Sequence, residues 1–325
     1  MDHPNYLKRV FFCAFFVLGG ATQFSWAQTT ANGGRSAFDF LSISPVSRAM
    51  GVGEAYIALG DDVGSIYYNP AGLASILTNE FDLTYMSLYQ GLNYEYMAFA
   101  SPLGESFPSF GGVVALSASF IQPGEMQRSN DQGQTIGTFS SGDNVFTLAL
   151  AKDISPAVHV GMSVKLIQQQ IDTVQSSLVD VDGGVVIIPP FNGMRIGIVL
   201  KNLGGQSDGY DLPLSLDAGL SYRRYELFSE QDDGAIAVDT SFPIKPIEDP
   251  VGMRVGLEYN YKWVGTSATL RTGYKFLDTY LNGVGFTVGA GLGLDFGGTV
   301  LFLDYAYAPE DIFGDAHRVS LTTKF

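Results

Sequence analysis

The feature that most limits how this chain can fold is an alternation of apolar and polar residues with a period of two. It recurs in segments of about ten residues from residue 80 to the end. In the clearest segment, Val251–Lys262, Met253 and Leu257 fall on one face, and Arg254 and Glu258 fall on the other. Successive side chains of a strand point to opposite faces, so each segment predicts a β-strand with one apolar and one polar face.

Fourteen segments carry this pattern. The clearer ones are Val158–Leu166, Val179–Ile187, Met194–Leu200, Leu214–Tyr222, Val251–Lys262, Ala268–Phe276 and Val284–Phe296. The others are Phe81–Tyr89, Leu92–Ser101, Val113–Ile121, Val145–Ala151, Ala235–Phe242, Val300–Ala308 and Arg318–Phe325. Segments of this length fit tilted membrane-spanning strands, and an even number fits a closed barrel. A soluble β-sandwich is the alternative, but its strands average about five or six residues. We therefore predict an all-β protein, a 14-stranded antiparallel transmembrane β-barrel.

The composition of the 325 residues agrees with this class. Charged residues make up 16% of the chain, against the roughly 25% usual for soluble domains, and the hydrophobic fraction of 46% excludes disorder. With 33 acidic and 18 basic residues the net charge is −15, which argues against a nucleic-acid partner. Three His and one Cys leave little material for a metal site, so no cofactor is predicted.

Few residues suggest an enzyme. A hydrolase needs a nucleophile with a base within hydrogen-bond reach. Ser163 and His159 share the polar face of one predicted strand, but nothing around them resembles a catalytic signature, and His317 falls in the opposite phase. We therefore predict a protein that is not an enzyme.

The first residues resemble a secretory signal. Lys8 and Arg9 precede the apolar run Val10–Gly20, and Ser25-Trp26-Ala27 offers small residues at a cleavage site. The run is too short to span a membrane as a helix. We predict a signal peptide at residues 1–27, a plug segment at 28–79 and a barrel at 80–325. The predicted location is the outer membrane of a Gram-negative-type bacterium, where the barrel contacts lipid.

The connections between the predicted strands differ in length. Short ones fall at the expected periplasmic end, namely Lys152–Pro156, Pro189–Asn192, Lys262–Gly265 and Gly297-Gly298. Longer, polar ones fall at the outward end, namely Gln122–Gly142, Gln168–Ser177, Leu203–Pro213, Pro243–Pro250 and Pro309–Ala316. Short periplasmic turns and long external loops are typical of outer-membrane barrels. Two connections, Pro102–Phe110 and Arg223–Gly234, break this rule because they would be long and periplasmic.

Residues 36–79 do not alternate and contain helix signals instead. These are Ser44-Pro45 before a helix through Met50, with Gly51 and Gly53 ending it; Asp61 or Asp62 before a turn running to Tyr68; and Asn69-Pro70 before Ala71–Ile76. Small helices and glycine turns placed before a barrel predict a plug inside its lumen.

The same stretch carries a family resemblance. Its residues are Ser47-Arg48-Ala49, Gly51, Gly53, Ala55, Asp61-Asp62 and Asn69-Pro70-Ala71-Gly72-Leu73-Ala74. As a set they resemble the N-terminal signature of the PorV/PorQ family, whose members are FadL-like outer-membrane barrels. The Asn-Pro-Ala element is also similar to one in the hatch of the FadL fatty-acid transporters. For PorV and PorQ proper, the resemblance implies a role in type IX secretion. There PorV binds the C-terminal signal domains of exported proteins at the translocon and carries them to the attachment complex.

Two functions follow. The first is a non-enzymatic accessory of type IX secretion that binds or shuttles exported proteins, with Gln122–Gly142 and Leu203–Pro213 as the docking surface. The alternative is a FadL-type transporter that binds a hydrophobic ligand in its lumen. Transport requires apolar inward residues, whereas several inward positions are polar, which favours a protein-binding or closed barrel. These positions are Arg254, Glu258, Arg271, Lys275 and Asp295.

Within the plug, structural roles are expected first. Arg48 can pair with Asp61 and Asp62 in the lumen and hold the plug to the wall, because buried charges need partners. Asn69 is expected to cap a helix rather than contact a ligand. The inward glycines of one strand are expected to let it bend or let the plug approach, rather than make room for a ligand. They are Gly285, Gly289, Gly291 and Gly293.

Overall fold

A computed structural model describes residues 36–88, 92–104, 111–122, 126–207, 209–245, 251–277, 285–310 and 314–325. Residues 33–325 form one compact unit. The predicted signal peptide, 1–27, lies outside the described residues, as do residues 28–35 of the predicted plug segment. No helix within the described ranges is long and apolar enough to cross a membrane.

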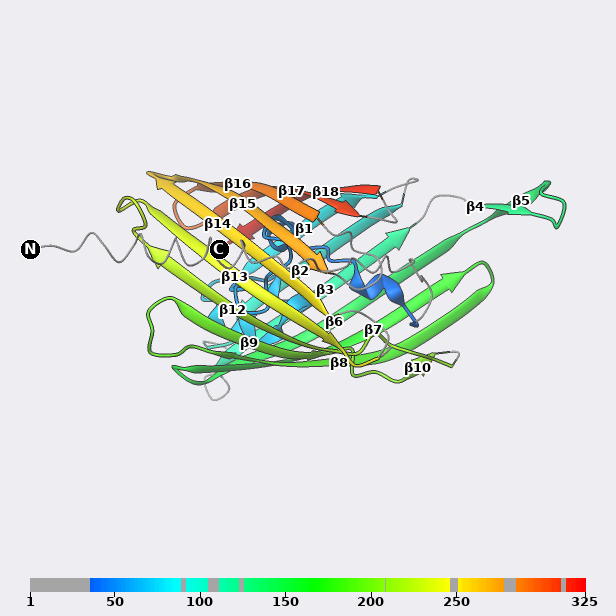
Figure 1. The fold of residues 1–325 in the computed structure, drawn as a ribbon, viewed down its shortest axis with the longest axis horizontal. Helices are drawn as coiled ribbons and strands as arrows, with labels where there is room; N and C mark the ends of the chain where they lie inside the picture. The colour runs from blue at the N-terminus through cyan, green and yellow to red at the C-terminus, as the bar shows by residue number, and fades with distance from the viewer. Residues whose placement is uncertain are drawn as a thin grey trace, which may run out of the picture. The chain divides into compact units, whose positions relative to one another are not determined.

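Fourteen strands form a closed antiparallel barrel (Figure 1). They are β1 (Glu80–Ser87), β2 (Asn93–Pro102), β3 (Gly112–Gln122), β6 (Ser141–Ser155), β7 (Val158–Ile171), β8 (Val174–Ile187), β9 (Met194–Lys201), β12 (Ser215–Tyr225), β13 (Asp232–Pro243), β14 (Gly252–Trp263), β15 (Thr266–Leu277), β16 (Gly285–Asp295), β17 (Val300–Glu310) and β18 (Gly314–Lys324). Each barrel strand pairs with the next barrel strand along the chain, and β18 pairs with β1. Each of the fourteen predicted segments overlaps one of them, so the predicted barrel is confirmed.

The seam between the first and last strands closes the ring. Its register runs from Glu80 opposite Lys324 to Ser87 opposite His317. Beyond Glu80, the backbones of Asn79 and Phe325 exchange two hydrogen bonds of 2.9 Å. The segment before the barrel is therefore tied to the C-terminal residue.

The outer face of the barrel is its apolar face. In β1, the side chains of Phe81, Leu83 and Tyr85 are 40–48% exposed, whereas those of Asp82 and Thr84 are buried. The same alternation runs along most strands, because the inward residues face the plug and the outward ones face away from the chain. An apolar outer band with polar residues inside is the arrangement of membrane-spanning barrels.

Three predicted outward connections are partly or wholly strands. Gln168–Ser177 was expected as a loop, but β7 and β8 pair as far as Ile171 and Val174 and leave a two-residue turn. Ladder hydrogen bonds continue past the apolar band, so polar residues here do not end the strands. Gln122–Gly142 contains a hairpin, β4 (Met126–Ser129) with β5 (Thr135–Phe139), which projects beyond the barrel (Figure 1). Leu203–Pro213 contains β10 (Gln206–Ser207) and β11 (Tyr210–Asp211).

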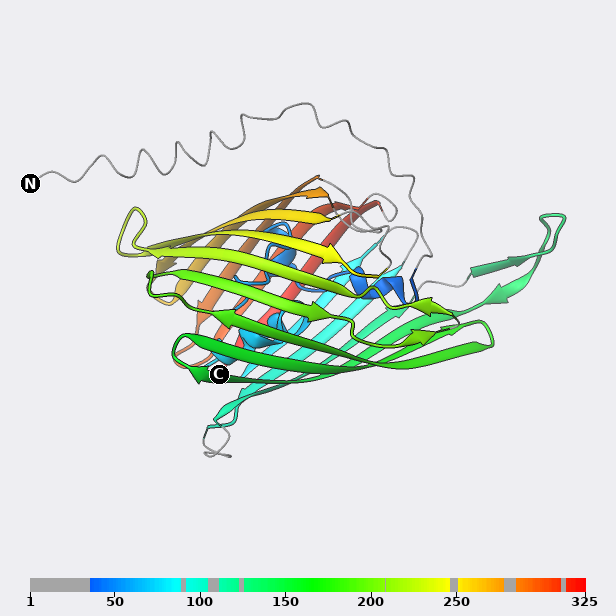
Figure 2. The same ribbon diagram turned by 60° about the horizontal axis from the view of Figure 1, so that its bottom comes forward.

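Residues 36–79, hereafter the plug, lie inside the barrel (Figure 2). They contain η1 (Asp39–Ser42), α2 (Ser47–Gly51), α3 (Ser65–Tyr68) and η2 (Pro70–Ser75). α2 packs against β15, β16, β17 and β18, and η2 packs against β3, β6, β7 and β8. The plug therefore contacts both sides of the ring.

The plug helices differ in detail from the predicted ones. α2 begins at Ser47 rather than at Ser44-Pro45, because the Ser44 carbonyl accepts a hydrogen bond from Arg318 of the wall and the chain stays extended there. The helix after Asn69 is a 3₁₀-helix whose first backbone N–H, that of Ala71, donates to Asn69 Oδ1 at 3.1 Å. Asn69 therefore caps η2, which is the structural role expected for it.

Candidate functional site in the barrel lumen

Glycines of the wall let the plug backbone approach closely. A Cβ on Gly161, Gly197, Gly256 or Gly273 would overlap plug backbone at Ala71, Ile57, Val52 and Gly53, respectively. These four glycines lie on β7, β9, β14 and β15, so the close approach occurs on opposite sides of the ring. The fit leaves no room for a methyl group at any of these positions.

The four inward glycines of β16 serve different purposes. A Cβ on Gly289 would come within 2.9 Å of Gly51 Cα, so this glycine admits the plug. Gly291 and Gly293 instead lie against side chains of the neighbouring strand, Asp304 and Phe302. Gly285 has a φ of +156° and faces Pro309. The expected close approach of the plug therefore applies to one of the four.

Arg48 is the central cation of the plug. Its Nη1 lies 2.6 Å from Asp61 Oδ1 and 2.8 Å from Asp62 Oδ2. Its Nε and Nη2 donate to the two oxygens of Glu258 on β14, at 2.9 and 3.0 Å. Such a bidentate pair fixes both position and orientation. Arg48 therefore joins three plug and wall carboxylates, as expected of a residue that holds the plug to the wall.

Glu258 extends this cluster around the wall. Besides Arg48, it accepts hydrogen bonds from Arg223 at 2.8 Å and from Arg271 at 2.8 Å. Arg223 also pairs with Asp233 at 2.6 Å, and Arg271 pairs with Asp304. The Glu258 side chain is 3% exposed, so three arginines depend on one buried carboxylate. We call Arg48, Asp61, Asp62, Glu258, Arg223, Asp233, Arg271 and Asp304 the charged cluster.

The protonation of the plug groups follows from these contacts. Burial alone would raise the pKa of Asp61, but Arg48, Arg223 and Arg195 lower it well below its ordinary value of 3.8. Burial lowers the pKa of Arg48, yet Asp61 and Glu258 outweigh it and raise that pKa. Both groups are therefore charged at neutral pH, and the plug is held by full ionic contacts.

Wall side chains also bind the plug backbone directly. Asp239 accepts a hydrogen bond from the Ile57 N–H at 2.7 Å, and Arg318 donates to the Ser44 carbonyl at 2.8 Å. Arg195 donates to the Gly60 carbonyl at 3.1 Å. These plug backbone groups are buried and have no partner within a helix, so the wall side chains satisfy their hydrogen bonds. The contacts thereby hold the irregular stretches of the plug in place.

The opposite side of the lumen is apolar. Plug residues Phe38, Phe40, Ile66 and Leu73 pack there against inward side chains of the wall and against Leu212. The wall residues include Met86, Leu88, Tyr94, Tyr96, Ala98, Ala100, Val113, Ala115, Ile121, Val145, Ala149, Ala151 and Ile167, from β1, β2, β3, β6 and β7 or the residues next to them. We call this the apolar chamber. Its lining is mostly hydrocarbon and plug side chains fill it. The same strands also carry buried polar side chains, among them Asp82 on β1 and Lys165 on β7.

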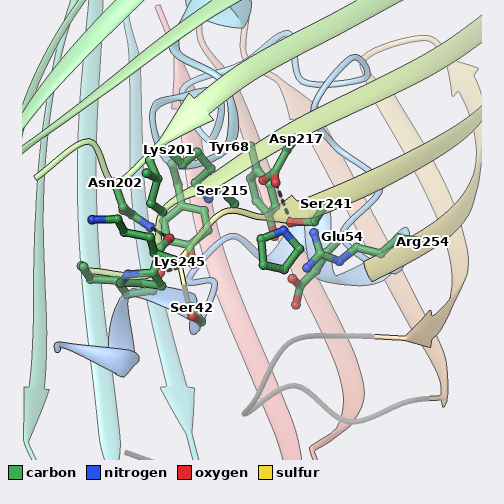
Figure 3. A pocket seen from close by; sticks show the side chains of 15 residues that line it. Ser42, Glu54, Tyr68, Lys201, Asn202, Ser215, Asp217, Ser241, Lys245 and Arg254 are labelled. Carbon is green, nitrogen blue, oxygen red and sulfur yellow. Dashed lines mark hydrogen bonds between the residues drawn. The ribbon is translucent and has the colours of Figure 1, made fainter. Parts of the chain in front are cut away.

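A small polar cavity lies beside the plug, toward the outward end of the lumen (Figure 3). Tyr68, Lys201, Asp217 and Arg254 are among the residues that line it. Lys201 Nζ lies 4.6 Å from the centre of the Tyr67 ring, a cation–π contact. The cavity volume is about 60 Å³, room for a few water molecules, whereas small-molecule sites occupy about 300–1,000 Å³.

The residues considered for catalysis are not brought together. His159 faces inward and lies 3.2 Å from Asp153, while Ser163 donates to Asp182 at 3.1 Å. His317 lies on the outer face against Tyr305. The part of the chain that the structure describes holds no group of three His, Cys, Asp or Glu side chains placed to bind a metal.

The predicted motif residues all lie in the plug, where most of them are buried against the wall. Arg48, Asp61 and Asp62 meet one another, whereas Asn69-Pro70-Ala71-Gly72 pack elsewhere, against β7 and β8. Gly51, the last residue of α2, faces β15 and β16, and Gly53, two residues later, lies against β14 and β15. Ala49 belongs to an apolar cluster with Ala235 and Ala237 of β13. Of the polar positions expected to face inward, Asp295 differs from the rest, because it is exposed at the last position of β16, where it accepts a hydrogen bond from the Gly297 N–H. Arg223 and Asp304 were missed, although their inward phase marks them.

No family model and no curated protein matches the sequence. Among solved structures, the chain is similar to the CymD monoaromatic hydrocarbon channel, with a TM-score of 0.56 and 12% identity over 89% of this chain and 98% of that one. It is also similar to the toluene transporter TbuX of Ralstonia pickettii (TM-score 0.56, 13% identity, 89% and 98%). A FadL homologue of Pseudomonas aeruginosa gives a TM-score of 0.52 at 11% identity (86% and 97%). The chain has a FadL-like fold.

Proposed function

We propose that this protein is a non-enzymatic channel of the outer membrane through which small hydrophobic molecules pass. The observation that carries the proposal is the apolar chamber, a mostly hydrocarbon-lined part of the lumen that plug residues, among them Phe38 and Phe40, fill. Polar inward residues had favoured a closed or protein-binding barrel. In the structure the buried ones, Arg254, Glu258, Arg271 and Lys275, lie on β14 and β15. Glu258 there pairs with Arg48 of the plug and with Arg271 of the wall. The printed descriptions of similar folds as hydrocarbon channels and toluene transporters support the same reading.

In this proposal the first plug residues act as the gate. Residues 36–43 reach the chamber through aromatic contacts and one backbone hydrogen bond, from Ala37 N–H to the Asp211 carbonyl at 2.9 Å. Apolar contacts are non-directional, so a hydrophobic solute can replace the two phenyl rings at little cost. The charged cluster holds α2 in place meanwhile. Entry therefore requires a local movement and not extraction of the whole plug.

Uptake by cells tests this proposal. The full chain is expressed in a bacterium that lacks its own channel of this type, and uptake of labelled toluene and a labelled long-chain fatty acid is measured. Uptake above the empty-vector level is expected for at least one probe. Leu88→Gln, which places an amide in the chamber, is expected to lower it several-fold, whereas Leu203→Gln at a half-exposed position leaves it unchanged. Uptake equal to the vector for both probes would overturn the proposal.

A second candidate is the secretion role that the PorV/PorQ resemblance implies. The hairpin β4–β5 favours it, because it stands outside the barrel and exposes 61% of Ile136. Of the two expected docking loops, Leu203–Pro213 turns partly inward, since Leu212 is buried in the chamber. The docking surface would therefore be the hairpin, and its partners the translocon or exported proteins with C-terminal signal domains.

Deleting residues 127–138 separates the candidates. The contacts of the hairpin with the barrel include an exposed ion pair, Arg128 with Asp172, so the barrel is expected to fold without it. A mild-detergent pull-down of the tagged protein from its host, with and without the deletion, is compared by mass spectrometry. Capture of exported proteins that depends on the hairpin would support secretion. Unchanged protein export in the deletion strain counts against it.

A further inference from the structure

Two rows of outward side chains run side by side across six neighbouring strands, β1, β2, β3, β6, β7 and β8. One row is Leu83, Met97, Ala118, Phe146, Leu166 and Val179, each residue directly opposite the next. The other is Phe81, Phe99, Leu116, Leu148, Val164 and Val181. Every side chain in the two rows is apolar.

Ala118 interrupts the first row. Its cross-strand neighbours are Met97 and Phe146, and its neighbours along β3 on the same face are Leu116 and Phe120. A methyl group among four large side chains leaves a dent in the outer surface. A groove with a volume of about 540 Å³ lies there, lined by members of both rows.

The inner side of the same wall carries small side chains. Inward positions of β2, β3 and β6 carry alanines, among them Ala98, Ala115 and Ala149, all at most 2% exposed. Lys165 lies beneath the groove, but its Nζ points into the lumen, 2.9 Å from Asp180 and 2.6 Å from Asp182. No charge is therefore aimed at the groove from Lys165.

We propose that this groove is a binding site for one acyl chain of a membrane glycerophospholipid. It lies on the apolar outer band, which faces hydrocarbon, and its volume falls within the range of small-molecule sites. In such surroundings binding comes from dispersion contacts, and a flexible chain regains those that an unfilled dent forfeits. The groove reaches Phe81, the second residue of β1, at the end with the shorter turns, which is the periplasmic side of such barrels. A phospholipid of that leaflet is therefore the occupant.

Native mass spectrometry of the full chain, purified from its own membranes in mild detergent, tests the site. Ala118→Phe fills the dent, and Ala290→Phe on β16 is the matched control, because Ala290 is another outward alanine between large side chains, Leu270 and Tyr305. One phospholipid is expected to stay bound to the wild type and to Ala290→Phe at an activation energy that strips other lipids. Ala118→Phe is expected to reduce this bound fraction at least five-fold.

Other outcomes overturn the proposal. Equal retention by Ala118→Phe and the control would show that the groove holds no lipid. Retention of lipopolysaccharide in place of a phospholipid, or a dimer of the chain lost in Ala118→Phe, would assign the groove to another occupant. Folding of both variants is verified by the shift between unheated and heated samples on a gel. The site lies outside the lumen, so hydrophobic uptake by Ala118→Phe is expected to be unchanged, and the result does not depend on the proposed function.

Discussion

The plug is held by different kinds of contact on its two sides, which are strands β12–β17 and strands β1–β7. On the first side, Arg48 and Glu258 form directional, bidentate contacts, and three arginines converge on one carboxylate. On the second, Phe38, Phe40 and Leu73 pack against apolar side chains with no preferred direction. Ionic clusters of this kind specify one geometry, whereas apolar packing tolerates substitution by another apolar body. The charged side is suited to anchoring the plug and the apolar side to exchanging it for a ligand.

The largest loss of stability is expected from a substitution of Glu258, the carboxylate at the centre of the charged cluster. Glu258→Gln leaves Arg48, Arg223 and Arg271 without their shared carboxylate, and removing one partner of a buried pair costs about 3–5 kcal/mol. The free energy of unfolding in detergent, measured by urea titration, reports the loss. Glu230→Gln, at an exposed turn position, is the matched control and is expected to have no effect. Equal stability of the two variants would show that the charged cluster does not anchor the plug.

A smaller loss of stability is expected from substitutions of the wall glycines that contact the plug backbone. Gly273→Ala, near the charged cluster, and Gly161→Ala, beside the apolar chamber, each place a methyl group against plug backbone, and overpacking costs about 1–3 kcal/mol. Both are expected to loosen the plug and raise ion conductance in planar bilayers. Gly161→Ala is expected to open the channel further, because the plug segment beside it is held by apolar contacts and neutral hydrogen bonds such as Asn69 to the Val185 carbonyl, with no ion pair among the described residues. Gly183→Ala, whose Cβ meets nothing within 4 Å, is the control.

The smallest expected effect is a dependence of stability on pH. The pKa of Asp61 is lowered in the folded protein, so its contribution to stability is complete above its ordinary value of 3.8 and is lost as pH falls through the lower folded value. The difference in melting temperature between the wild type and Asp61→Asn, followed by Trp263 fluorescence, is expected to be constant from pH 8 to 5 and to shrink below pH 4. Asp61→Asn is expected to remove about 1 kcal/mol at pH 7, since Asp61 is partly exposed, and to make the acid decline shallower. An unchanged decline in Asp61→Asn would assign it to other carboxylates.

The strands were predictable because one face of each must be apolar. Val251–Lys262 became β14, Gly252–Trp263, with the expected residues on each face. The ends were less predictable, since Gln168 and its polar neighbours pair in the ladder although they bury no apolar surface. The apolar–polar alternation indicates the membrane-spanning part of each strand, whereas backbone hydrogen bonds extend the strands beyond that part.

The site was predictable only where its partners are close in sequence. Arg48 and Asp61 are 13 residues apart, and the plug segment alone suggested their pairing. Arg48 and Glu258 are 210 residues apart. Their meeting depends on the register of the whole ring and on the depth of the plug within it, and no local pattern in the sequence encodes either. For the same reason, the sequence did not predict that the lumen has a charged and an apolar side.

The seam between β1 and β18 has a consequence for assembly. Asn79, the residue that leads out of the plug, is hydrogen-bonded to Phe325, the last residue of the chain. The ring therefore cannot close until β18 has been made and exported. Contacts between the two ends of a chain form late because of their loop-closure entropy. The plug precedes all fourteen barrel strands in the chain. It is therefore enclosed only when the last strand, β18, pairs with β1.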